Sequence, residues 1–154
     1  MLPLPGLFHF RGVVLTKKSK YGLKAVLYLA REAAAGHGPI PVARIAESER
    51  LPRKFLEAIL LDLKRHGLLR SKKGPHGGYS LIRCPTEVTL GEIIGALDTA
   101  RPLVSCIGQG DARCAECEDQ ADCRIRAAMT EVQAAATRVL DQTTLSVLAA
   151  RSAP

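Results

Sequence analysis

The sequence is poor in aromatic residues and contains no tryptophan. Aromatic side chains make up 4% of the 154 residues, whereas apolar residues as a whole make up 47%. A core is therefore expected, but it must be built from aliphatic side chains. No apolar run approaches the roughly 18 residues that a membrane-spanning helix needs, and the N-terminus lacks the basic start and small-residue cleavage site of a secretory signal. These absences predict a soluble cytoplasmic protein that does not enter a membrane.

Residue combinations typical of enzymes are also lacking. The four histidines, His9, His37, His66 and His76, are spread over separate parts of the chain. No Ser/His/Asp set, phosphate-binding glycine-rich loop or pair of carboxylates stands out. We therefore expect no catalytic residues and no small-molecule substrate.

Positive charge is concentrated in the first half of the chain. The net charge is +7, but residues 1–83 carry sixteen Lys and Arg against five Asp and Glu, while residues 84–154 carry six against ten. A solvated basic face would explain such a surplus without any partner. Asymmetry between halves is, however, typical of proteins that bind nucleic acid with one part of the chain, and the first half is expected to do so.

Hydrophobic periodicity and capping residues predict three helices in the first half. The first runs from an N-cap at Thr16 to about Ala35. A short second helix, 42–48, is followed after a tight turn by a longer helix that has Pro52 at its first position and stops at Gly67. Two helices this close together match a helix–turn–helix. The longer helix is expected to bury Phe55, Leu56, Ile59, Leu60 and Leu63.

A basic hairpin follows directly. Leu69–Ser71 and Tyr79–Ile82 are predicted to be short strands around the turn Lys72–Gly78, which would form a wing. A helix–turn–helix followed at once by a basic hairpin is a more specific pattern than either alone. The expected fold class is mainly α with a small β-wing: a winged helix-turn-helix domain plus a long C-terminal dimerisation helix.

These elements would present several residues to DNA. The N-terminal residues of the second helix reach base edges in the major groove, where Arg pairs with guanine and Glu accepts from cytosine. Wing cations can follow the phosphate backbone, and the wing glycines Gly77 and Gly78 would allow close approach and positive φ. Lys64 and Arg65, at the far end of the helix, are expected to be solvated or near phosphate.

Any single cation here could be an ordinary surface charge, but the concentration of cations on these two elements favours DNA binding. The candidate DNA-binding residues are Arg50, Arg53, Lys54, Glu57, Lys72, Lys73, His76 and Gly77.

The second half opens with a capping-box pattern at Thr89 and Glu92 that predicts a short helix to about Leu97. A long helix is predicted from about Arg124 to Leu148. Its apolar stripe either pairs with the same stripe of a second copy, giving a two-fold dimer, or folds back onto the first helix of its own chain. Pairing is favoured because few other elements remain to cover the stripe. The stripe consists of Ile125, Met129, Val132, Ala136, Val139 and Leu140.

Four of the five cysteines fall within eighteen residues, spaced C-x7-C-x2-C-x5-C: Cys106, Cys114, Cys117 and Cys123. Thiols gathered in a polar segment are hard to explain as core residues, and thiolates bind zinc or iron–sulfur clusters. The outer spacings are long for structural zinc and suit a larger cluster, although zinc and a redox thiol or disulfide switch remain alternatives. Cys84, far away in sequence, is expected to be a half-buried small side chain and not a ligand.

The pattern divides the chain into four parts. Residues 1–13 are expected to form a disordered N-terminal arm, and residues 14–100 the winged helix-turn-helix DNA-binding domain. Residues 101–123 would form the cysteine-rich cluster-binding loop, and residues 124–154 the dimerisation helix and tail.

The chain resembles the Rrf-type winged-helix regulators, typified by the iron–sulfur cluster regulator IscR, the nitric-oxide sensor NsrR and the cysteine-metabolism regulator CymR. The resemblance covers about residues 14–148 and is carried by LTKKSKYGLKAVLYLA, FLEAILLDLKRHGLLRSKKGPHGGYSL and EVTLGEIIGALD, followed by the cysteines. It implies a dimeric bacterial transcription factor whose operator affinity changes when a cluster is lost or altered. Cys106, Cys117 and Cys123 match the three loop cysteines of cluster-binding members, and Cys114 is additional.

The chain departs from the family at the positions of the non-cysteine ligands. Where IscR has a ligating histidine, this chain has Arg126, and where some relatives use a first-helix carboxylate or histidine of the partner subunit, it has Lys20 and Lys24. The resemblance therefore implies ligation by cysteines alone, with Cys114 completing the set.

The expected function is that of a homodimeric regulator, a repressor, which binds a double-stranded DNA operator. It would sense iron–sulfur status, oxidants or nitric oxide through an iron–sulfur cluster of the 2Fe–2S or 4Fe–4S type. The alternative is a zinc-stabilised or thiol-switch regulator that binds DNA or partner proteins without a cluster.

Overall fold

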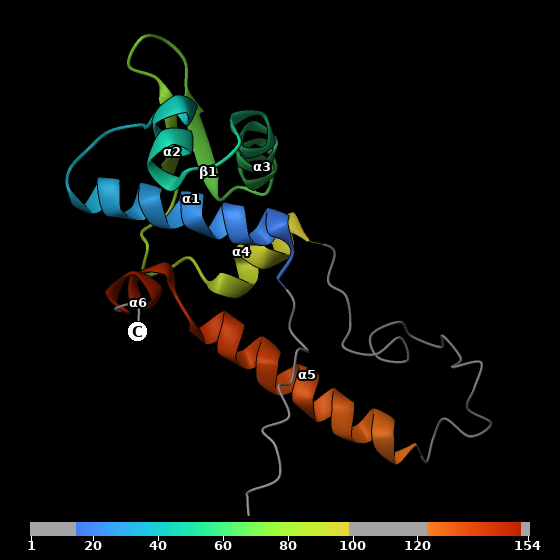
Figure 1. Ribbon diagram of the computed structural model, residues 1–154. Coiled ribbons are helices and arrows are strands. Elements are labelled where there is room, and N and C mark those ends of the chain that lie inside the picture. The colour runs from blue at the N-terminus through green and yellow to red at the C-terminus, as the bar shows by residue number, and fades with distance from the viewer. Residues whose placement is uncertain (1–14, 99–122, 152–154) are drawn as a thin grey trace, which may run out of the picture.

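The computed structural model describes residues 15–98 and 123–151 and is mainly helical with a two-stranded antiparallel sheet (Figure 1). This confirms the expected fold class. The elements in chain order are α1 (Lys17–Ala34), α2 (Val42–Glu49), α3 (Arg53–Arg65), β1 (Leu69–Lys72), β2 (Gly78–Leu81), α4 (Leu90–Leu97), α5 (Arg124–Gln142) and α6 (Leu145–Ala150). The expected arm 1–13 and most of the cysteine-rich segment lie outside the described residues.

Helix α1 is the central element, with α2 and α3 on one side of it and α4 on the other (Figure 1). It begins where the sequence predicts, because the Thr16 side chain accepts a hydrogen bond of 3.1 Å from the backbone N–H of Ser19. Gly22 lets α4 approach closely: a Cβ at this position would lie 2.1 Å from Leu97 Cδ1. The core is aliphatic apart from Tyr28, as the scarcity of aromatic residues predicts.

The helix–turn–helix is formed by α2 and α3. Leu56, Ile59, Leu60 and Leu63 are fully buried, as predicted. Two details differ. Pro52 is the N-cap of α3 and not its first helical residue. Phe55 is 39% exposed, because it lies at the surface beside α1. Its ring packs edge-on against the ring of Tyr21, with the two ring centroids 5.7 Å apart.

The wing strands β1 and β2 pair antiparallel, with Leu69 opposite Leu81 and Lys72 opposite Gly78. The buried side chains of Leu69 and Leu81 anchor the hairpin to the core, whereas the other residues of β1 are exposed. The strands extend as predicted to within one residue.

The predicted continuous C-terminal helix is wrong. Helix α5 ends at Gln142, and a short α6 follows after Thr144. Between them the chain pairs with the segment before α4: Leu90 N–H donates to the Thr143 carbonyl at 2.8 Å, and Leu145 N–H donates to the Val88 carbonyl at 2.9 Å. Helical backbone could not make this pairing, and the buried Leu145 side chain anchors α6 against the core.

Helix α5 extends away from the rest of the described chain (Figure 1). None of its residues is buried, and Ile125, Val132 and Val139 are 72%, 41% and 58% exposed. It packs mainly against α4, while α6 makes the contact with α1. Half of the predicted apolar stripe is thus exposed on the described chain, whereas Met129, Ala136 and Leu140 are half-buried. Among the described residues, none of the helices is long and apolar enough to cross a membrane.

Candidate functional site

The basic N-terminal end of α3 is exposed. Arg53, Lys54 and Glu57 lie on its outer surface, and Arg50 lies in the turn before it. Arg53 Nε is 3.1 Å from Glu57 Oε1, one helical turn away. The side chains of this pair are 66% and 48% exposed, so its contribution to stability is small. The pair holds the Arg53 guanidinium along the exposed face of α3.

Arg50 has a left-handed backbone conformation, with φ 52° and ψ 51°. Among the described residues it is the one non-glycine residue with positive φ. For such a residue this conformation costs about 1 kcal/mol or more. The left-handed conformation of Arg50 ends α2 and turns the chain into α3. A glycine would adopt this conformation without strain.

The turn of the wing carries three exposed cationic or titratable side chains, Lys72, Lys73 and His76. Gly77, in contrast, is buried, and its N–H donates to the Gly74 carbonyl at 2.9 Å. A Cβ at Gly77 would lie 2.3 Å from the Lys72 carbonyl oxygen. The expectation of positive φ is wrong for Gly77 and holds for Gly78; Gly74, to which that expectation did not extend, also has positive φ. Gly77 shapes the tight wing turn and presents little surface of its own.

One side-chain hydrogen bond links the wing to α3, and another links the two wing strands. Lys64 Nζ donates to Ser71 Oγ at 2.7 Å, and Arg70 Nε donates to Ser80 Oγ across the hairpin at 3.1 Å. Lys64, expected to be solvated or near phosphate, is exposed but bound to the first wing strand. Serines in a short strand give no sequence signal for such a role, because the contact depends on how α3 and β1 are folded together.

The cysteine set is only partly described. Cys106, Cys114 and Cys117 lie outside the described residues. Cys123 is half-buried at the N-cap of α5, where its Sγ accepts the backbone N–H of Arg126 at 3.4 Å. Cysteine binds metal as the thiolate. Within the described ranges, no three His, Cys, Asp or Glu side chains gather as a metal site. The four thiols are donors that suit a zinc ion or an iron–sulfur cluster.

The structure also describes Cys84 and the three positions at which the chain departs from the family's non-cysteine ligands. Cys84 is exposed, so the expectation of half-burial is wrong: it lies in the surface turn after β2, where its N–H donates to Glu87 Oε2 at 3.1 Å. Lys20 and Lys24 are exposed on α1, and Arg126 lies in the first turn of α5. Lysine and arginine side chains offer hydrogen-bond donors and no acceptor, so these three do not suit the role of metal ligands.

Comparison with known proteins agrees with this geometry. Residues 15–151 match the Rrf2 family, described as an iron-dependent transcriptional regulator. A protein of Rhodobacter capsulatus, named as an Rrf2-like HTH-type transcriptional regulator, is 36% identical over 143 residues, which cover 92% of this chain and 95% of that protein.

Solved structures give the same result. CymR, the global cysteine regulator of B. subtilis, superposes with a TM-score of 0.73 at 29% identity, over 92% of this chain and 99% of that one. The IscR of T. potens superposes with a TM-score of 0.69 at 25% identity, over 93% and 95%. These relatives are regulators and not enzymes, in agreement with the sequence. The chain belongs to the Rrf2 family of transcriptional regulators.

Proposed function

We propose that this regulator is a homodimeric repressor that binds a two-fold DNA operator and responds to an iron–sulfur cluster. The observation that carries the DNA-binding part is the joint exposure of the α3 N-terminus and the wing. Arg50, Arg53 and Lys54 lie on one element, and Lys72 and Lys73 on the other. The Lys64–Ser71 hydrogen bond holds the two elements together, so that both can meet one duplex.

In this proposal α3 enters the major groove and the wing follows the backbone. Arg50, Arg53, Lys54 and Glu57 would contact bases or phosphates, while Lys72, Lys73 and His76 would contact the backbone. Gly77 contributes by allowing the wing turn. Residues 14–100 would be the DNA-binding domain.

The dimer rests on α5. Within the described chain, none of the 19 residues of α5 is buried, and most helical stability comes from a packed apolar face. Pairing with the same helix of a second copy would bury Ile125, Val132 and Val139. It would also give the regulator the two-fold symmetry of a palindromic operator. Residues 124–154 would form the dimerisation part.

The sensing part rests on donor chemistry. Residues 101–123 would hold the cluster through Cys106, Cys114, Cys117 and Cys123, with Cys114 completing the set. The cluster would supply a reversible reaction with oxidants or nitric oxide. The cysteines of this chain would supply the ligands. Because α5 begins directly after Cys123, binding or loss of the cluster would act on the start of the dimer helix.

Similarity to an IscR protein supports the cluster. Similarity to a global cysteine regulator shows that family membership alone does not decide the signal. A colourless protein with one zinc per chain, or one with reversible thiol oxidation and no metal, would favour the zinc or thiol-switch alternative.

Anaerobic purification followed by iron and sulfide analysis tests the sensing part. We expect a coloured protein with iron and acid-labile sulfide, and loss of both in Cys114→Ala. Cys84→Ala, an exposed cysteine outside the segment, is the matched control and should keep them. A Cys114→Ala protein with an unchanged spectrum and iron content would show that Cys114 is not a ligand.

The DNA-binding part is tested by selecting a duplex from a random library with the wild-type protein. The affinity for that duplex is then measured with the cluster intact and after its removal by a chelator. We expect a selected sequence with two-fold symmetry and a different affinity in the two states. Equal affinities would contradict sensing, and failure to select any sequence would contradict operator binding.

A further inference from the structure

Helix α1 begins with an unfavourable charge pattern. Its first residues include Lys17, Lys18 and Lys20, and its first turn contains no acidic residue. The N-terminus of a helix is the positive end of its dipole, so carboxylates stabilise it and cations destabilise it. The start of α1 therefore depends on negative charge from other parts of the fold.

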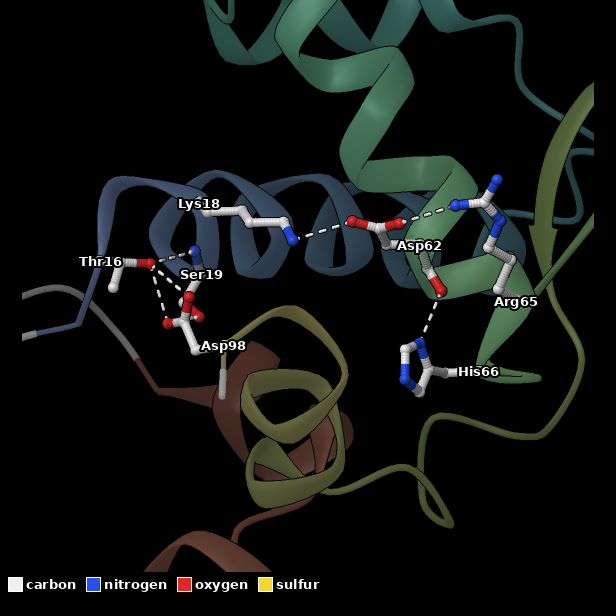
Figure 2. A network of polar contacts seen from close by, with 7 residues as sticks. All are labelled: Thr16, Lys18, Ser19, Asp62, Arg65, His66 and Asp98. Atoms are coloured by element: carbon white, nitrogen blue, oxygen red, sulfur yellow. Dashed lines mark hydrogen bonds and ion pairs between the residues drawn. The ribbon is translucent and has the colours of Figure 1, made fainter. Parts of the chain in front are cut away.

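Asp98 supplies that charge from the end of α4. Both oxygens of its carboxylate lie 2.8 Å from Thr16 Oγ1, and the Ser19 hydroxyl also donates to Oδ2 (Figure 2). Ser19 is fully buried, so its hydroxyl would lose its hydrogen-bond partner if Asp98 moved away. A buried hydroxyl without a partner is costly.

The same turn of α1 is joined to α3. Lys18 Nζ is 2.8 Å from Asp62 Oδ2, and Arg65 lies 3.5 Å from the other oxygen (Figure 2). The hydrogen bond from Lys18 holds the pKa of Asp62 below its ordinary value, in spite of partial burial. Asp62 is thus a carboxylate at the C-terminal half of α3, held by the turn that Asp98 caps.

We propose that Asp98 is a positioning residue that couples the cysteine segment to α3 through the first turn of α1. In the sequence Asp98 stands directly before residues 99–122, which contain three of the four clustered cysteines. Displacing Asp98 would remove the carboxylate from the start of α1 and leave Ser19 unsatisfied. The turn would loosen, and Lys18 would no longer be fixed against Asp62. The coupling to cluster state rests on the function proposed above, whereas the mechanical link does not.

Hydrogen exchange tests the mechanical link without DNA or cluster. In cluster-free Asp98→Ala we expect exchange of the α1 first-turn amides to rise about tenfold, as for loss of a charge-assisted hydrogen bond. Amides at the C-terminal half of α3 should follow by about threefold. Glu87→Gln removes the same charge from an exposed loop and should change neither. Faster exchange confined to α1, with α3 unchanged, would overturn the link.

Operator affinity tests the coupling. In the wild-type protein the ratio of affinities for the selected duplex, with and without cluster, defines the coupling, expected to be at least about fivefold. We expect this ratio to fall towards one in Asp98→Ala and to be partly restored in Asp98→Asn, which keeps a hydrogen-bond acceptor. Lys18→Met leaves Asp98 in place and cuts the contact with Asp62. It should lower the ratio as well, and it serves as the test variant if Asp98→Ala does not fold.

The two proposals fail in different ways. A wild-type ratio of one would contradict cluster sensing, and hydrogen exchange alone would then decide the link. A wild-type ratio above one that persists in both Asp98→Ala and Lys18→Met would overturn the coupling role of Asp98 and leave the proposed function standing.

Discussion

The main-chain groups of Ile40 and Tyr79 exchange two hydrogen bonds, of 2.9 and 2.8 Å, and this bridge joins the wing to the segment that leads into α2. The wing is therefore fixed at two places. Its first strand is bound to α3 through Ser71, and its second strand to the start of the helix–turn–helix through Tyr79. A DNA duplex would meet α3 and the wing as one preformed surface.

Gly78 makes that bridge possible, and its replacement should break it. A Cβ at this position would lie 2.2 Å from the Ile40 carbonyl carbon and oxygen. Gly78→Ala should therefore lower the free energy of unfolding by about 2 kcal/mol, measured by urea denaturation, and should weaken DNA binding. Gly38→Ala, where a Cβ meets nothing within 4 Å, is the control. Equal stability of the two variants would contradict the close approach.

Arg50 should show opposite effects on stability and on DNA binding. Arg50→Gly relieves the left-handed strain and should raise the free energy of unfolding by about 1 kcal/mol. Arg50→Ala keeps the strain. Both variants lose the guanidinium, so both should bind the selected duplex more weakly and to the same extent. Unchanged affinity in both would show that Arg50 does not contact DNA.

The wing lysines should act through phosphates. Lys72→Ala and Lys73→Ala should each weaken binding to all sequences alike, and each should reduce the salt dependence of the binding constant by roughly one counterion. Fluorescence anisotropy at several salt concentrations measures this slope. Arg151→Ala, which removes one exposed positive charge at the end of α6, should leave the slope unchanged. A sequence-dependent weakening would instead indicate base contacts.

The α5 stripe should decide the oligomeric state. The double variant Val132→Asp and Val139→Asp places charges in the proposed interface and should give a monomer in sedimentation. Its affinity for a two-fold duplex should fall about a hundredfold, because the second half-site is no longer tethered. Ala134→Asp, on the opposite face of the helix at 3.6 residues per turn, should remain dimeric. A double variant that sediments as a dimer would rule out this surface.

The capping box of α4 should give a pH-dependent contribution to stability. Glu92 accepts from the Thr89 N–H at 2.9 Å and pairs with Arg83 at 2.6 Å. The Thr89 backbone first, and then Arg83, lowers the pKa of Glu92 below its ordinary value. Because the folded pKa is depressed, the contribution is present above the ordinary pKa and is lost as the pH falls through the folded pKa.

Glu92→Ala should therefore cost about 1 kcal/mol near neutral pH, and the difference from wild type should narrow below about pH 4. Thermal unfolding followed at several pH values measures this difference. Glu47→Ala, at an exposed position of α2, should show little pH-dependent change. A constant difference across the range would mean that the charge of Glu92 does not matter.

Local sequence patterns determined much of this protein. The N-caps Thr16 and Thr89, the stop at Gly67 and the periodic leucines of α3 act within a few residues, so the helices, the hairpin and the aliphatic core could be predicted from them. The exposed basic residues of α3 and the wing followed from the same patterns.

Tertiary structure decided what joins these elements. The C-terminal helix is interrupted at Thr143 and Thr144, because the backbone there pairs with the distant segment from Val88 to Leu90. Lys64 binds Ser71, Phe55 stays at the surface, and Asp98 accepts a hydrogen bond from Ser19, 79 residues before it. Each of these contacts joins residues that are distant in the sequence and that only folding brings together. A periodic sequence pattern reports neighbours along one helix or strand and therefore does not reveal them.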